Sequence, residues 1–231
     1  MLLTQVKILY EDKEIFVVVK PPGMPSQQER SPAMDMVSYL KNLLVARDKV
    51  KNPYIAVVHR LDKPVGGVMV YGKTPAAAGD LSRQIAQKTA EKNYMAVVHG
   101  LMEAQEGTME DLLIRDKKTN TSQVVSKKIK PVPGDAKKAV LSYQVIKTAQ
   151  KDSESYSLVK VRLETGRHHQ IRVQMSHAGH PLAGDRRYGM AGDGFFQIGL
   201  FSSALSFDHP ADGRRVTFTA EPDAQPFLMF L

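Results

Sequence analysis

Residues 59–62, His-Arg-Leu-Asp, form a polar turn between two short apolar runs, and Asp62 is the side chain in this turn best suited to chemistry. The runs at residues 55–58 and 68–71 are rich in Val and bounded by Gly and Pro, which predicts two buried strands. A carboxylate placed where a buried strand gives way to a loop can face a cleft while rigid backbone fixes its position. Asp62 is therefore the first candidate for catalysis.

Residue types alone leave a second interpretation of Asp62 open, a structural ion pair with its neighbours Arg60 or Lys63. The wider pattern favours catalysis. His-Arg-Leu-Asp, followed by Gly-Gly and an apolar strand that ends in a Lys at residues 66–73, resembles the signature of the RluA family of pseudouridine synthases. The motif Asp of that family is essential. The related RsuA family typically has Gly at the position of His59, so the resemblance is to RluA.

Three further segments resemble motifs of the same family, in the same order along the chain. They are Lys-Pro-Pro-Gly at residues 20–23, Lys-Asn-Tyr-Met-Ala-Val-Val-His-Gly at residues 92–100, and Gly-Arg-His-His-Gln-Ile-Arg-Val at residues 166–173 with a continuation to residue 189. The resemblance covers roughly residues 8–220. Two positions depart from it, because Val65-Gly66 stands where the family commonly has Thr-Ser, and His168 where it commonly has Thr. These departures concern local hydrogen bonding and RNA preference rather than the reaction.

The resemblance implies an RNA pseudouridine synthase acting on ribosomal or transfer RNA. Such an enzyme breaks the bond between C1′ of the sugar and N1 of uracil, turns the base, and rejoins it through C5. The reaction is an isomerisation, so no cofactor is expected. An ionised carboxylate can assist it as a nucleophile or as an electrostatic partner of the sugar or base. The resemblance assigns that role to Asp62.

Two further catalytic residues follow from the matched motifs. Arg172 would keep Asp62 ionised by Coulomb attraction, because a guanidinium stays charged and binds carboxylates bidentately. Tyr94 would stack on the uracil or take a proton from the sugar, and both roles stay open. The structural alternatives are a surface helix Arg for Arg172 and a core aromatic for Tyr94.

Contacts with RNA are expected from four residues of the matched motifs. An enzyme of this kind must extrude its target nucleotide from the base stack. Arg60 is expected to fill the vacated stack or hold the RNA backbone, and Lys20 to hold the site or a phosphate. Lys20 has the alternative of an ordinary strand-end lysine. Lys92 and His59 complete the set of expected RNA-binding residues.

Composition fits a basic, globular RNA-binding protein. The 231 residues carry a formal net charge of +8, and residues 115–151 alone hold ten basic and two acidic side chains. Clustered Lys suits sequence-independent contact with phosphates, but it also suits a solvated face that keeps a protein soluble. The same segment would serve a non-catalytic RNA-binding protein, which is the alternative function. No apolar run is long enough to span a bilayer, so a cytoplasmic location is expected by default. The sequence does not indicate an oligomeric state, and a monomer is the default expectation.

Cysteine is absent, which excludes disulfides and thiolate metal sites. A metal-dependent hydrolase is the remaining rival, built from the four histidines His168, His169, His177 and His180. Gly179 and Pro181 interrupt the helix that would present the last two, and no second carboxylate-rich motif completes a site. No metal is therefore expected.

The expected fold is α+β, with a mixed, mostly antiparallel sheet and flanking helices in a single catalytic domain of residues 1–231 without an N-terminal S4 domain. Predicted strands lie at residues 6–10, 15–19, 55–58, 68–71, 92–100, 108–114, 139–147, 155–164, 199–207 and 215–219. Predicted helices lie at residues 32–47, 75–87 and 167–178, begun by Ser31-Pro32, Thr74-Pro75 and Thr165. A loop that moves against RNA is expected at residues 131–135.

Overall fold

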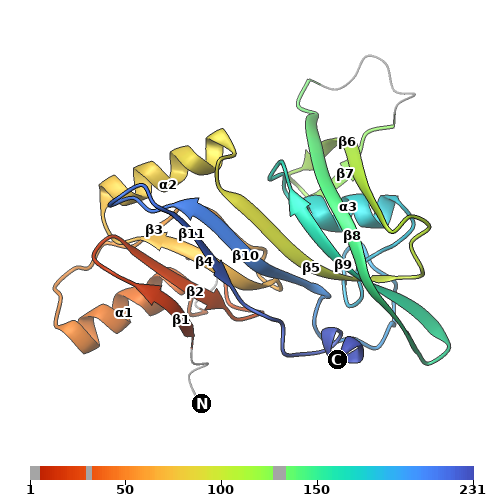
Figure 1. The fold of residues 1–231 in the computed structure, drawn as a ribbon, viewed down its shortest axis with the longest axis horizontal. Coiled ribbons are helices and arrows are strands. Elements are labelled where there is room, and N and C mark those ends of the chain that lie inside the picture. Colours follow the sequence, from red (N-terminus) through yellow and green to blue (C-terminus); the bar gives the residue numbers. More distant parts are fainter. Residues whose placement is uncertain (1–5, 30–32, 127–133) are drawn as a thin grey trace. The chain divides into compact units, whose positions relative to one another are not determined.

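The computed structural model describes residues 6–29, 33–126 and 134–231 (Figure 1). The chain forms two compact units. Unit 1 comprises residues 1–92 and 201–222, and unit 2 comprises residues 93–200 and 223–231. Both units combine β-sheet with helix, and most strand pairs are antiparallel, so the predicted α+β class with a mixed, mostly antiparallel sheet is confirmed.

The sheet of unit 1 is organised around β4 (Gly66–Gly72). The strand order is β1-β2-β4-β10, with β3 paired to β4 and β11 paired to β10. The other strands are β1 (Lys7–Glu11), β2 (Ile15–Lys20), β3 (Ala56–Val57), β10 (Leu200–Asp208) and β11 (Arg215–Thr219). β4 is antiparallel to β2 and parallel to β10. The expected strand at residues 55–58 is real but only two residues long, so a longer stretch than expected forms the Asp62 loop.

Both faces of β4 are covered, because all seven of its residues are buried. On one face, Val68 and Val70 pack with Ile15 of β2 and with Ala77 and Leu81 of the helix α2 (Pro75–Gln87). The hydroxyl of Thr74 accepts the backbone N–H of Ala77 at the start of α2, as the sequence predicts. In Figure 1, α2 and α1 lie on opposite sides of these strands.

Helix α1 (Met36–Asp48) begins later than expected. Its N-cap is Asp35, whose carboxylate accepts the backbone N–H groups of Val37 and Ser38 over 2.9 and 3.2 Å. The expected cap at residues 31–32 lies outside the described residues. Asp35 was not among the expected caps. It suits the position because its negative charge also interacts favourably with the positive end of the helix dipole.

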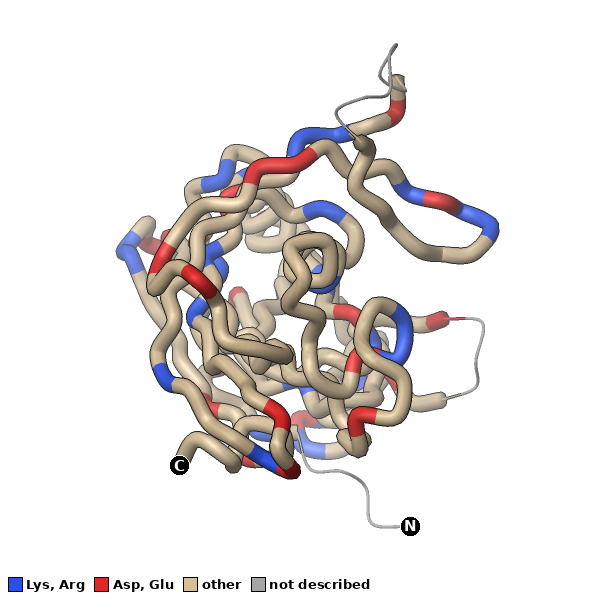
Figure 2. Tube along the Cα trace, turned by 90° about the vertical axis from the view of Figure 1, so that its right-hand side faces the viewer, with Lys and Arg blue, Asp and Glu red and all other residues tan. Residues whose placement is uncertain are grey.

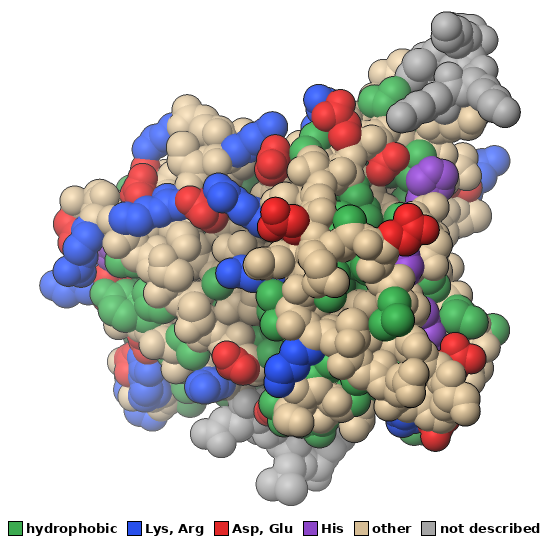
Figure 3. Space-filling view, turned by 45° about the vertical axis from the view of Figure 1, so that its right-hand side comes forward, with side chains coloured by type: hydrophobic (Ala, Val, Ile, Leu, Met, Phe, Trp, Pro, Cys, Tyr) green, Lys and Arg blue, Asp and Glu red, His purple; other side chains and the backbone are tan. Residues whose placement is uncertain are grey.

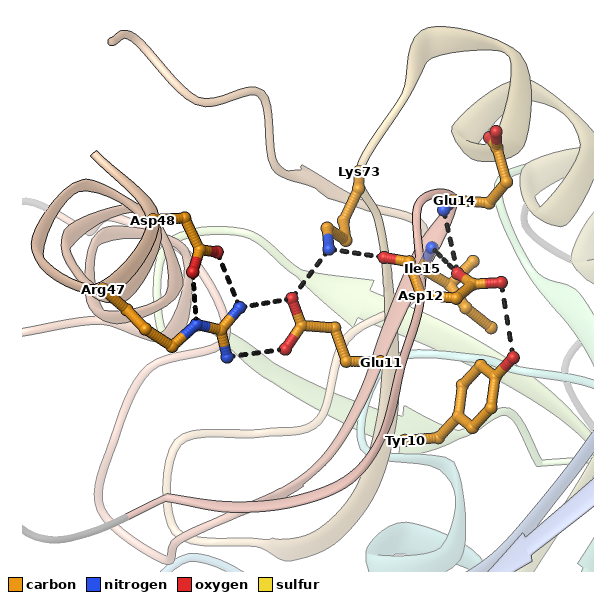
Figure 4. Close-up of polar contacts among 8 residues, drawn as sticks. All are labelled: Tyr10, Glu11, Asp12, Glu14, Ile15, Arg47, Asp48 and Lys73. Atoms are coloured by element: carbon orange, nitrogen blue, oxygen red, sulfur yellow. Dashed lines mark hydrogen bonds and ion pairs between the residues drawn. The ribbon is translucent and has the colours of Figure 1, made fainter. Parts of the chain in front are cut away.

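Ion pairs fasten the end of α1 to the β1–β2 hairpin. Figure 4 shows Arg47 forming a bidentate pair with Glu11 over 2.8 and 2.7 Å, while Lys73 donates to the same carboxylate over 2.8 Å. Lys73 also donates to the backbone oxygen of Asp12. Lys73, the residue directly after β4, thus joins the end of this strand to the β1–β2 hairpin.

Unit 2 holds the strand order β5-β9-β8-β6-β7, with the first two residues of β5 belonging to unit 1. The strands are β5 (Glu91–His99), β6 (Glu106–Asp116), β7 (Thr121–Val124), β8 (Lys137–Lys151) and β9 (Glu154–Leu163). β7 was not predicted, because its four residues, Thr-Ser-Gln-Val, carry too little apolar periodicity to be recognised. It pairs antiparallel with β6 and completes a hairpin.

Helix α3 (Gln170–His177) is shorter than expected and differs in its cap. Its N-cap residue is His169 in the left-handed conformation, with φ of 54° and no side-chain capping bond. The hydroxyl of Thr165 instead donates to the side-chain oxygen of Gln170 over 2.8 Å. The expected cap at Thr165 and the expected start of the helix at residue 167 are therefore wrong, since the helix begins at Gln170.

The end of the chain packs through two aromatic residues. A short 3-10 helix, Phe227–Phe230, buries Phe227 and Phe230, while Leu231 is exposed. Among the described residues, no helix combines the length and the apolar character needed to cross a bilayer.

Candidate active site

Asp62 lies in the loop between β3 and β4, and both of its neighbours are anchored through their backbone. The hydroxyl of Ser26 donates to the carbonyl oxygen of Leu61 over 2.9 Å and accepts the Leu61 backbone N–H over 3.2 Å. On the other side of Asp62, the carbonyl oxygen of Lys63 accepts the backbone N–H of Gly23 over 2.8 Å. Asp62 itself is partly exposed, so its carboxylate stands on a fixed backbone within reach of solvent.

Lys20, the last residue of β2, places a fully buried ammonium group beside this loop. Its Nζ atom donates to three carbonyl oxygens, those of Met24 at 2.7 Å, Pro21 at 3.1 Å and Lys63 at 3.2 Å. Burial lowers the pKa of Lys20 to about 7, although the negative charges of Asp62 and Glu29 act to raise it. Of the two roles expected for Lys20, these contacts favour holding the site over binding a phosphate.

His59 fastens the first half of the loop to β4. Its Nε2 atom accepts the backbone N–H of Val70 over 3.1 Å, which requires a neutral ring with its proton on Nδ1. Desolvation, and secondly the charge of Lys92, lower the pKa of His59 to about 3. Lys92 is itself largely buried, which lowers its own pKa. At neutral pH, His59 is therefore a hydrogen-bonding residue rather than a cation.

Arg60 is exposed, unlike the other basic residues expected at this site. The next residue in the chain, Leu61, is buried. The turn therefore alternates between a residue that holds the loop and one that faces solvent, as an RNA contact from Arg60 would require.

In unit 2, Arg172 forms a buried ion pair with Asp185. Its Nε and Nη2 atoms donate to the two carboxylate oxygens over 2.7 and 2.6 Å, and its guanidinium lies 5.1 Å from the ring centre of Tyr188. Burial would raise the pKa of Asp185, but the hydrogen bonds and charge of Arg172, with the N–H groups of Arg187 and Tyr188, bring this pKa below its ordinary value. Sequence reasoning expected a carboxylate partner for Arg172 but did not consider Asp185.

Tyr94 lies on β5 in unit 2 with 7% of its surface exposed. Lys20, His59, Arg60, Asp62 and Lys92 belong to unit 1, whereas Tyr94 and Arg172 belong to unit 2. The structure thus groups the expected RNA-binding residues around the Asp62 loop. The catalytic roles expected of Tyr94 and Arg172 stay predictions.

Histidines that a metal-dependent hydrolase would have used as ligands make other contacts. His168 bonds to the hydroxyl of Ser122 over 2.9 Å, His169 bonds to the hydroxyl of Tyr188 over 2.7 Å, and the two imidazole rings stack 3.7 Å apart. In the part of the chain that the structure describes, no group of three or more His, Cys, Asp or Glu side chains is placed to hold a metal ion.

Comparison with known proteins decides the family. The family model described as RNA pseudouridylate synthase matches residues 14–177, a range that contains Lys20, Asp62, Tyr94 and Arg172. The chain belongs to the RNA pseudouridylate synthase family.

Curated relatives of this pseudouridine synthase support the RluA-type assignment. The RNA pseudouridine synthase YlyB of Bacillus subtilis, itself called uncharacterized, is 37% identical over 92% of this chain and 68% of the relative. Ribosomal large subunit pseudouridine synthase D of Zymomonas mobilis is 33% identical, over 97% and 71% of the two chains. tRNA pseudouridine synthase C of Haemophilus influenzae is 30% identical, over 95% and 94%.

Solved structures show the same fold. Human RNA pseudouridylate synthase domain containing 1 superposes with a TM-score of 0.76 at 22% identity, over 95% of this chain and 84% of the human chain. Human RNA pseudouridylate synthase domain containing 4 gives a TM-score of 0.77 at 20% identity, over 96% and 90%. The synthase fold predicted from the motifs is therefore confirmed.

Sequence reasoning missed two residues that contact expected site residues or their neighbours. Asp185 neutralises Arg172, and its place thirteen residues further along the same motif block was the available signal. Ser26 holds Leu61, and nothing in the sequence around a lone Ser marks such a contact. Both residues act through tertiary contacts.

The basic segment of this synthase is only partly described. Lys127, Lys128 and Lys130 lie outside the described residues, as does most of the loop expected at residues 131–135. Figure 2 shows Lys and Arg interspersed with Asp and Glu along the trace. On the face drawn in Figure 3, blue and red side chains are likewise mixed. On this face, basic side chains are therefore scattered among acidic ones and do not form one continuous basic area.

Proposed function

We propose that this pseudouridine synthase isomerises a uridine of ribosomal or transfer RNA, with Asp62 as its catalytic carboxylate. The observation that carries the proposal is that the backbone on both sides of Asp62 is fixed by hydrogen bonds. Asp62 is partly exposed, while the backbone groups of the residues on both sides of it are held by hydrogen bonds from Ser26 and Gly23. A fixed backbone suits a side chain that must meet a reacting atom in a defined position.

The chemistry follows from the isomerisation. Cleavage of the C1′–N1 bond leaves electron deficiency at the sugar, which an ionised carboxylate stabilises by attack or by charge. After the uracil has turned, C5 bonds to C1′ as the carboxylate leaves or withdraws. C5 then gives up its proton and N1, now free of the sugar, takes one up, so the overall change is an isomerisation. Asp62 attacking the base instead is the alternative. Tyr94 and Arg172 keep the roles that the resemblance implies, with Tyr94 at the uracil or the sugar proton and Arg172 supporting the carboxylate.

Recognition of the RNA is proposed to begin at the exposed side chain of Arg60. Among the relatives, one is named for transfer RNA and another for the large ribosomal subunit, so both RNA classes are substrates to test. A single catalytic domain, acting as a monomer in the cytoplasm, is proposed as the working form.

The test compares pseudouridine in ribosomal and transfer RNA from cells with and without the gene. Deletion should remove pseudouridine from at least one position, and wild-type protein should restore it. Asp62→Asn, which keeps the side-chain size and removes the charge, should restore none. Equal rescue by both proteins would refute a catalytic Asp62, and an unchanged map after deletion would favour a non-catalytic RNA-binding protein.

A further inference from the structure

A serine outside the four sequence motifs holds the residue before Asp62. The side chain of Ser26 is buried, and its hydroxyl serves both main-chain polar groups of Leu61, at 2.9 Å to the oxygen and 3.2 Å from the nitrogen. One hydroxyl can do this because it carries one donor and two acceptor lone pairs. Ser26 thus takes the place that a neighbouring strand would have beside Leu61.

Ser26 is itself fixed to the centre of unit 1. Its carbonyl oxygen accepts the hydroxyl of Tyr71 over 3.1 Å, and Tyr71 is a fully buried residue of β4. The preceding residue, Pro25, accepts the backbone N–H of Met36 at the start of α1 over 3.0 Å. The Ser26 side chain therefore links Leu61 to a segment that is itself bonded to β4 and to the start of α1.

The loop needs such a contact because it leaves the sheet early. β3 ends at Val57, and residues 58–65 have no strand structure before β4 begins. Without the Ser26 hydroxyl, the buried N–H and C=O groups of Leu61 would lose these partners, and the loop would move to recover them. A displacement of Asp62 by about 1 Å is enough to slow a reaction on the order of 100-fold.

We propose that Ser26 is a positioning residue of the pseudouridine synthase reaction, which sets the place of the Asp62 carboxylate through the backbone of Leu61. The inference rests on the proposed catalytic role of Asp62. It concerns the rate of the chemical step and not RNA affinity, because the buried Ser26 hydroxyl faces the protein backbone.

The test is a single-turnover assay with enzyme in excess over total RNA from cells that lack the gene. Ser26→Ala should lower the rate constant for pseudouridine formation by about 10- to 100-fold, with RNA affinity changed less than about threefold. Ser26→Thr, which keeps a hydroxyl, should recover most of the rate. Ser26→Cys, a weaker hydrogen-bonding group of similar shape, should lie between wild type and the Ala variant.

Ser157 supplies the matched control. It is a fully buried Ser of β9 in unit 2, and its hydroxyl likewise donates to a carbonyl oxygen, that of Gly100 at 2.8 Å, and accepts the Met102 N–H at 3.4 Å. Ser157→Ala should lose comparable stability without slowing the chemical step. All rates are measured well below the thermal midpoint of each variant, and Ser26→Cys carries the test if Ser26→Ala does not fold.

A rate for Ser26→Ala within about twofold of Ser157→Ala would overturn the inference, as would a loss confined to RNA affinity. Asp62→Asn is assayed in parallel to separate the two proposals. An active Asp62→Asn enzyme would refute the proposed function itself. An inactive Asp62→Asn enzyme together with an unaffected Ser26→Ala enzyme would refute only the positioning role.

Discussion

Lys20 places its amino group inside unit 1, where Nζ donates hydrogen bonds to three carbonyl oxygens. A buried charge is costly unless it is paired or well hydrogen-bonded. Here the bonded carbonyls include Lys63, the residue after Asp62. The hydrogen bonds of Nζ therefore join the segment after β2 to the loop of the candidate catalytic residue.

The first prediction concerns the pH dependence of stability that Lys20 produces. The folded protein holds the pKa of Lys20 at about 7, against an ordinary value of 10.5. Between these values the unfolded chain binds the proton and the folded chain releases it, so stability rises with pH, by up to about 1.4 kcal/mol per pH unit. Urea unfolding at pH 6.5 and 9.5 should show wild type gaining stability relative to Lys20→Met. The same comparison with Lys63→Met, an exposed neighbour, should show no gain, and an equal gap at both pH values would contradict the prediction.

The second prediction concerns the stability of the protein at acidic pH, which His59 should influence. Its folded pKa of about 3 lies below the ordinary 6.5, so below pH 6.5 the unfolded chain takes up a proton that the folded chain refuses. Stability should fall as pH decreases from 6.5 towards 3, by up to about 1.4 kcal/mol per pH unit. His59→Gln, whose side-chain oxygen can still accept the Val70 N–H, should flatten this dependence in chemical unfolding. His177→Gln is the control, and a slope that survives in His59→Gln would exclude His59 as its source.

The buried pair of Arg172 and Asp185 should be sensitive to loss of one partner. Their side chains are 6% and 0% exposed, so Asp185→Asn removes, inside the protein, the carboxylate charge that two donors of Arg172 contact. Such a change costs about 3–5 kcal/mol of unfolding free energy. Glu110→Gln removes the same charge from an exposed pair with Lys138 and should cost under about 1 kcal/mol. A small loss for Asp185→Asn would mean that another acceptor compensates Arg172.

At the scale of elements, β4 and β10 meet as a parallel pair through a glycine. Gly67 has φ of +123°, and a Cβ atom there would lie 2.3 Å from the backbone oxygen of Ser202. A parallel strand pair normally has room for a Cβ atom at every position, so the close approach of Ser202 is a local feature of Gly67. The second Gly of the motif is therefore required by the packing of β10 on β4.

Gly67→Ala should destabilise unit 1 by at least about 2 kcal/mol, because backbone strain and a backbone clash occur together. The matched control is Gly79→Ala in α2, where a Cβ atom meets nothing within 4 Å. That substitution should be neutral or stabilising by up to about 1 kcal/mol, because Ala favours helix more than Gly does. Denaturant midpoints measure both, and similar midpoints for the two variants would disprove the close approach.

At the scale of the whole molecule, the net charge of +8 favours association with RNA. Lys117 and Lys118 are exposed in the turn between β6 and β7. If both contact phosphates, Lys117→Ala with Lys118→Ala should reduce the slope of log affinity against log salt by about 1.4–1.8. Filter binding or fluorescence anisotropy from 50 to about 200 mM salt covers the useful range.

Lys7→Ala with Lys41→Ala changes the net charge equally, at exposed positions on β1 and α1 in unit 1. This control should leave the slope nearly unchanged. Equal slopes for the two double variants would show that the β6–β7 turn makes no phosphate contact and that only the total charge matters.

The sequence by itself determined the family, the fold class and most elements. Asp62, Lys20, Tyr94 and Arg172 lie in motifs whose order along the chain carries the information, and β2, β4 and α2 follow from apolar runs and from the Thr74-Pro75 cap. These features are local, since they depend on residues a few positions apart. Local signals failed where tertiary contacts replaced them, as at Thr165, which bonds to Gln170 instead of capping α3.

Only the tertiary structure decided which side chains hold the site. Ser26 and Leu61 are 35 positions apart, and Lys20 and Lys63 are 43 apart. Partners so distant in sequence are chosen by how buried polar groups find hydrogen bonds once the strands have packed, and no local pattern records that choice. The same reason explains why the sequence named Arg172 but could not name Asp185 as its partner.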